Sequence, residues 1–135
     1  YELDYIHLSL WAGYNSKPEN SEKSYAELFR EILDDKTKLL IVGGIFEEDT
    51  ATDAIENYAD LIAVARGTLI DPNFSKKVTE GKGDTILHKI SPETVEYSHL
   101  TLGVLEAFSR EDSLGLPPLP GGESIRTLHT GKYDI

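Results

Sequence analysis

Apolar residues along the first 81 positions alternate between short unbroken runs and stretches of helical spacing. The predicted strands are residues 3–10, 38–45 and 59–66. The predicted helices are residues 24–35, 47–58 and 71–81. The second and third strands are almost continuously apolar, which is typical of strands buried on both faces of a parallel sheet. We therefore predict a β-α-β-α-β-α order wound into a parallel α/β sheet.

Helix signals mark the expected boundaries. Ser24 followed by Glu27 predicts a capping box for the first helix, and Thr50 is the predicted N-cap of the second. Asp71, followed by a proline, predicts the start of the third helix, and Gly81 predicts its end. Apolar positions of the first helix form one stripe that we expect to be buried: Leu28, Phe29, Ile32 and Leu33.

The pattern changes after residue 81. Residues 91–112 predict a helix with Ser91 as its cap, and the proline-rich stretch that follows predicts a stiff extended segment. We therefore divide the chain into residues 1–81, which carry the βα units, and residues 82–135, a mainly helical C-terminal extension that packs on them.

Composition narrows the classes of function. A net charge of −11 disfavours nucleic acid and anionic membranes as partners. Cysteine is absent, which excludes disulfides and thiolate metal sites and suggests a reducing compartment, so we expect a cytoplasmic location. The histidines show no metal-ligand spacing, so we predict no metal site. Methionine is also absent, and we expect the sequence to be part of a longer polypeptide.

Two predicted strands end in residues suited to an anion. The second ends at Gly43 and Gly44, and the third at Ala65 and Arg66. Ligands of parallel α/β sheets gather at the carboxyl ends of strands, where glycine lets backbone N–H groups approach a phosphate closely. The arginine guanidinium offers a forked pair of donors that matches phosphate oxygens. The alternative is a simple glycine turn beside a solvated arginine.

Residues 38–81 resemble the last two βα units of the old yellow enzyme family of FMN-dependent NAD(P)H oxidoreductases. The correspondence lies at Val42, Gly43, Gly44, Ile45, Ala54, Ile55, Ala59, Asp60, Leu61, Arg66, Asp71 and Pro72. Residues 3–10 resemble the sixth strand of the family, with lower specificity. The resemblance therefore implies strands six to eight of a TIM (β/α)8 barrel. It also implies that FMN phosphate is held by Gly43, Gly44 and Arg66, with Ala65 standing where the family has a glycine.

The resemblance further implies the chemistry of a whole enzyme. NAD(P)H reduces FMN, and the reduced flavin passes hydride to an activated alkene or similar small acceptor. The family's catalytic residues lie on earlier strands, so we expect this chain to contain none and to be inactive without the N-terminal part of the barrel. A homo-oligomer is compatible with the resemblance. Two alternatives stay open: a phosphate- or nucleotide-binding α/β module without a redox role, and another phosphate-binding barrel enzyme.

Overall fold

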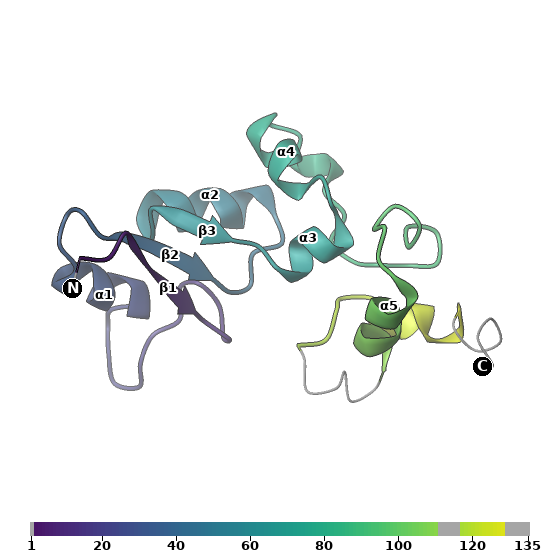
Figure 1. Cartoon of the computed structure of the whole chain (residues 1–135), viewed down its shortest axis with the longest axis horizontal. Helices are drawn as coiled ribbons and strands as arrows, with labels where there is room; N and C mark the ends of the chain where they lie inside the picture. Colours follow the sequence, from purple (N-terminus) through teal and green to yellow (C-terminus); the bar gives the residue numbers. More distant parts are fainter. Residues whose placement is uncertain (1, 111–116, 129–135) are drawn as a thin grey trace. The chain divides into compact units, whose positions relative to one another are not determined.

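The computed structural model describes residues 2–110 and 117–128 and forms two compact units, residues 1–65 and 66–135 (Figure 1). Each unit is described by itself. The predicted division into residues 1–81 and 82–135 stays a prediction. Those parts of the predicted C-terminal segments that fall on residues 111–116 and 129–135 lie outside the described residues.

The first unit is a parallel sheet with two helices. Its strands are β1 (Tyr5–Ser9), β2 (Lys38–Val42) and β3 (Leu61–Ala63), hydrogen-bonded in the order β1-β2-β3. Its helices are α1 (Tyr25–Ile32) and α2 (Glu48–Asn57), which follow β1 and β2 in the chain. The predicted α/β class and parallel pairing are therefore confirmed, whereas the barrel stays a prediction.

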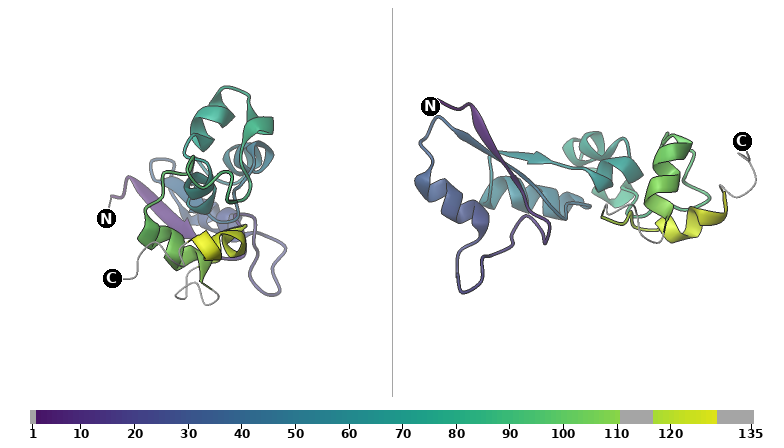
Figure 2. Two further views of the ribbon diagram at one scale, coloured as in Figure 1. Left: turned by 90° about the vertical axis from the view of Figure 1, so that its right-hand side faces the viewer. Right: turned by 60° about the horizontal axis from the view of Figure 1, so that its bottom comes forward.

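Both helices of this unit cover the same face of the sheet (Figure 2). Parallel strands joined in sequential order by crossovers of one hand place their helices on one side. Leu39 and Ile41 of β2 point to that side and are fully buried. Leu40 and Leu61, which are paired neighbours on the opposite face, stay partly exposed. The core of the unit is therefore built on one face of the sheet.

The helix caps agree with the sequence in one case and differ in the other. Ser24 caps α1, because its hydroxyl accepts the Glu27 N–H while the Glu27 carboxylate accepts the Ser24 N–H. The prediction of Thr50 as the cap of α2 is wrong. The helix begins earlier, after Glu47, and the Thr50 hydroxyl instead accepts the Glu47 N–H at 3.2 Å from within the first turn.

The second unit contains short helices. They are α3 (Arg66–Ile70), α4 (Phe74–Thr79), η1 (Gly83–Thr85), α5 (Leu102–Ser109) and η3 (Gly122–Leu128). Apolar side chains from these helices and from the segments between them form its core: Ile70, Phe74, Ile86, Ile90, Leu105, Leu119 and Ile125. Gly81 follows α4 with a φ of +65°, which confirms the predicted helix end.

Two helix starts predicted in this region are wrong. The helix α4 begins at Phe74 after Asn73, and not at Asp71, whose buried carboxylate accepts hydrogen bonds from Lys77 of α4 and from Leu87 and Tyr97 further along the chain. Residues 92–99 form successive turns, and α5 begins only after Thr101. His99 has a φ of +54°, a left-handed conformation that interrupts a right-handed helix.

Candidate functional site

The glycine turn follows β2 at its carboxyl end, as predicted. Gly43 has no room for a side chain, because an added Cβ would lie 2.1 Å from the Leu10 carbonyl oxygen. Gly44 has a φ of +66°, a conformation that glycine adopts at little cost. The N–H groups of Gly44 and Ile45 donate no hydrogen bond within the part of the chain that the structure describes. The turn therefore offers main-chain donors at the carboxyl ends of the strands, where ligands of α/β proteins bind.

The loop after β1 packs directly on this turn. The Leu10 N–H donates to the Val42 carbonyl at 2.8 Å, which extends the pairing of β1 with β2 by one residue. The Tyr14 N–H donates to the Gly43 carbonyl at 2.9 Å. The sequence analysis did not predict this packing. Its role depends on contacts with residues about thirty positions away, for which the local pattern holds no signal.

The side chain of Tyr14 joins the same loop to α2. Its hydroxyl donates to Asp53 Oδ2 at 2.6 Å, and Asp53 Oδ1 accepts the Asn57 side-chain amide at 2.8 Å. Burial, together with the hydrogen bond and negative charge of Asp53, raises the pKa of Tyr14 to about 12. The bonds from Tyr14 and then Asn57 lower the pKa of Asp53. The ring of Tyr14 meets Tyr58 edge to face, with centroids 5.3 Å apart.

The second predicted half of the site lies at the start of the other unit. The strand β3 ends at Ala63, and α3 begins at Arg66. Arg66 is therefore the first residue of a helix and not, as predicted, the last residue of a strand. Ala65 is not among the described residues with positive φ, so its backbone is one that alanine adopts without strain. Arg66 Nη1 donates to the Pro118 carbonyl at 3.1 Å. Because Gly43 and Gly44 belong to one unit and Arg66 to the other, their joint site stays a prediction.

Asp71 has a structural role in the second unit. Its buried carboxylate accepts hydrogen bonds from the Lys77 ammonium at 2.6 Å and the Tyr97 hydroxyl at 3.2 Å. It also accepts the N–H groups of Asn73 and Leu87, each at 3.0 Å. Burial acts to raise the pKa of Asp71, but the bond from Lys77 and the backbone N–H groups outweigh it and lower that pKa. Asp71 therefore joins the turn before α4 to the segments that carry Leu87 and Tyr97.

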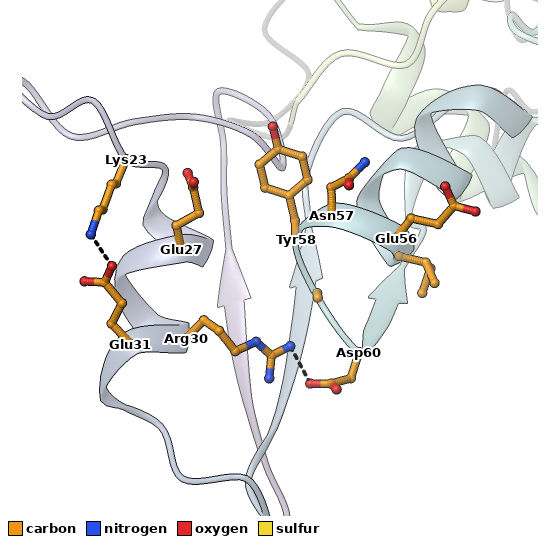
Figure 3. Close-up of a pocket in the computed structure, with 10 residues that line it drawn as sticks. Lys23, Glu27, Arg30, Glu31, Glu56, Asn57, Tyr58 and Asp60 are labelled. Carbon is orange, nitrogen blue, oxygen red and sulfur yellow. Dashed lines mark hydrogen bonds and ion pairs between the residues drawn. The ribbon is translucent and has the colours of Figure 1, made fainter.

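A cavity of about 500 Å³ lies between α1 and α2, away from the predicted site residues (Figure 3). Arg30 Nη2 bonds to Asp60 Oδ2 at 2.7 Å across it, whereas the ion pair of Lys23 with Glu31 lies on the α1 side alone. Asp60 Oδ2 also accepts the Leu39 N–H at 2.8 Å, and this bond, more than Arg30, lowers the pKa of Asp60. The arrangement fastens α1 to the start of β3, which is a structural role for this groove.

The described residues hold neither a metal-ligand cluster nor a membrane-spanning helix. They contain no group of three or more histidine, cysteine, aspartate or glutamate side chains placed to hold a metal ion. Among the helices of residues 2–110 and 117–128, none has the length and apolar character needed to cross a membrane.

Comparison with known proteins identifies oxidoreductases as relatives. Over 102 residues the chain is 37% identical to a Bacillus subtilis (strain 168) protein named probable NADH-dependent flavin oxidoreductase YqiG. The alignment covers 73% of the chain and 27% of that protein. Over 97 residues it is 27% identical to an uncharacterized oxidoreductase of Streptococcus pyogenes serotype M5 (strain Manfredo), covering 67% of the chain and 24% of that protein. The chain thus spans about a quarter of the length of these curated relatives. No protein-family model matches the chain.

Proposed function

We propose that this chain is the FMN-phosphate-binding part of an NAD(P)H-dependent flavin oxidoreductase of the old yellow enzyme type. The observation that carries the proposal is the 37% identity to a protein named an NADH-dependent flavin oxidoreductase. The same aligned length covers about a quarter of that relative, which fits a chain that holds part of a larger catalytic domain. The catalytic groups of the whole enzyme then lie outside these 135 residues.

The exposed side of α1 supports placing this sheet within a TIM barrel. Tyr25, Leu28 and Ile32 are spaced so that they share one side of the helix. Ile32, which the sequence pattern predicted to be buried, is 77% exposed, and Tyr25 is 39% exposed. The side of α1 toward α2 carries Glu27 and Arg30 instead (Figure 3). The apolar stripe therefore faces away from α2, where a preceding βα unit of a barrel would pack.

The residues of the glycine turn fit a phosphate group. The Gly44 N–H donates no hydrogen bond within the described residues, and glycine at positions 43 and 44 keeps side chains away from the turn. In the proposed site, Arg66 supplies positive charge and the Ala65 main chain a further donor. When bound, FMN supplies the hydride relay between NAD(P)H and an activated alkene or similar acceptor. The residues of this chain bind and orient its phosphate.

The test is the cofactor content of the full-length protein. We expect the purified protein to show the visible absorption bands of an oxidised flavin, and chromatography of the released cofactor to identify FMN. Anaerobic addition of NADH or NADPH should bleach these bands. A colourless protein that takes up no added FMN would contradict the proposal. If that protein still bound other phosphate compounds, the alternative of a phosphate-binding module or barrel enzyme without a redox role would replace it.

A further inference from the structure

The direction of the Gly44 N–H is set by Tyr14. The described peptide bonds are all trans, and in a trans peptide the carbonyl and the N–H of the same unit point in opposite directions. The Gly43 carbonyl is held by the Tyr14 N–H at 2.9 Å. The N–H of Gly44 belongs to that same peptide unit and must therefore point away from the loop after β1. A rotation of this peptide would break the bond to Tyr14 before it could redirect the donor.

Tyr14 can hold the peptide only if its own position is fixed. Its side chain is 8% exposed, and its hydroxyl bonds to Asp53, which lies 39 residues along the chain in α2. The loop is therefore fastened both to the glycine turn and to the helix that follows it. Burial and the bond to Asp53 raise the pKa of Tyr14 to about 12, which keeps the hydroxyl protonated and donating well above neutral pH.

We propose that Tyr14, anchored by Asp53, is a positioning residue that aims the Gly44 N–H at the phosphate of the bound flavin. This inference rests on the proposed function, since it takes the anion at the turn to be FMN phosphate. Tyr14 acts through the Gly43–Gly44 peptide and does not touch the ligand. Its effect should therefore appear in the recognition of the phosphate and not in that of the rest of the flavin.

The experiment compares FMN with riboflavin, which lacks the phosphate, in the full-length protein. Tyr14→Phe removes the bond to Asp53 but keeps the ring and the backbone N–H. We expect it to weaken FMN binding about fivefold, which corresponds to one ordinary hydrogen bond, while riboflavin affinity stays unchanged. Asp53→Ala should weaken FMN binding to a similar extent. The double variant should lose no more FMN affinity than the single variant with the larger loss, because both changes break the same bond.

Tyr58→Phe is the matched control. Its ring contacts Tyr14, but its hydroxyl makes no hydrogen bond among the described residues, so the preference for FMN should stay at the wild-type value. An equal loss of FMN and riboflavin affinity in Tyr14→Phe would indicate a general structural role and overturn the proposal. An FMN-to-riboflavin affinity ratio in Tyr14→Phe equal to that of the wild type would overturn the proposal as well. If the wild-type protein itself did not prefer FMN over riboflavin, the result would contradict the phosphate site of the proposed function and not only the role of Tyr14.

Discussion

Single residues at the glycine turn are constrained by different physical causes. Gly43 has a φ of +156° and also has the Leu10 carbonyl where a Cβ would stand, whereas Gly44 is required by its φ of +66° without such a close contact. The sequence predicted glycines at a strand end, but it could not separate these two reasons. The first depends on a loop that returns to the turn from β1, and the second depends only on local backbone conformation.

The difference predicts unequal costs of substitution. Gly43→Ala should destabilise the protein more than Gly44→Ala, because a contact of 2.1 Å with a main-chain oxygen forces the loop and the turn apart. Gly44→Ala should cost about 1–3 kcal/mol, the usual range for a strained φ. Chemical denaturation of the full-length variants measures both free energies of unfolding.

Gly103→Ala provides the control for these two changes. Gly103 lies in α5, and a Cβ added there meets no atom within 4 Å. Alanine in a helix is favoured over glycine by roughly 0.5–1 kcal/mol, so this variant should be slightly more stable. Equal unfolding free energies for Gly43→Ala and Gly103→Ala would contradict the close approach of Leu10.

At the scale of elements, the start of α4 is held by the buried pair of Asp71 and Lys77. The Asp71 carboxylate also accepts hydrogen bonds from the Leu87 N–H and the Tyr97 hydroxyl, so this one side chain joins α4 to the segment that follows it. The sequence placed Asp71 at a helix start but could not reveal its later partners. Those partners lie 16 and 26 residues downstream in segments without regular periodicity.

Stability should depend on the charge of Asp71. Asp71→Asn removes the charged partner of Lys77, which keeps its bond to the Thr85 carbonyl and its contact with the Tyr97 ring. Breaking a buried ion pair in this way costs about 3–5 kcal/mol at neutral pH. The folded state lowers the pKa of Asp71 below the ordinary value of 3.8. Its stabilising contribution is therefore complete above that value and is lost as the pH falls through the lower folded-state pKa.

Urea unfolding at a series of pH values tests this expectation. The stability difference between wild type and Asp71→Asn should be constant near neutrality and should shrink in acid below pH 3.8. Asp84→Asn, an exposed position in η1 of the same unit, should change stability by less than about 0.5 kcal/mol. A difference between wild type and Asp71→Asn that is independent of pH would mean that the charge of Asp71 is not what stabilises this region.

At the scale of the whole molecule, the proposed site joins residues from both units. The glycine turn belongs to the first unit and Arg66 to the second, and the backbone between them passes through β3 and Ala65. A functional measurement can therefore show whether the two halves act on the same phosphate.

Arg66→Ala in the full-length protein should weaken FMN binding by about 1.5–3 kcal/mol, the range for a hydrogen bond to a charged group. Riboflavin affinity should change less, because riboflavin lacks the phosphate. Lys76→Ala removes an exposed positive charge from α4 in the same unit and should leave both affinities unchanged. Unchanged FMN affinity in Arg66→Ala would mean that Arg66 has a structural role, to which its hydrogen bond with the Pro118 carbonyl contributes.

The sequence by itself determined the βα order, the parallel α/β class, the capping box of α1 and the glycines after β2. These features follow from residue types and spacings within a few positions, since periodicity and cap chemistry are local. Only the tertiary structure decided that Tyr14 holds the Gly43 carbonyl, that Asp71 accepts the Leu87 N–H, and that Ile32 stays exposed on α1. Each of these depends on which distant segment packs against the residue, and no local pattern of apolar and polar positions encodes that choice.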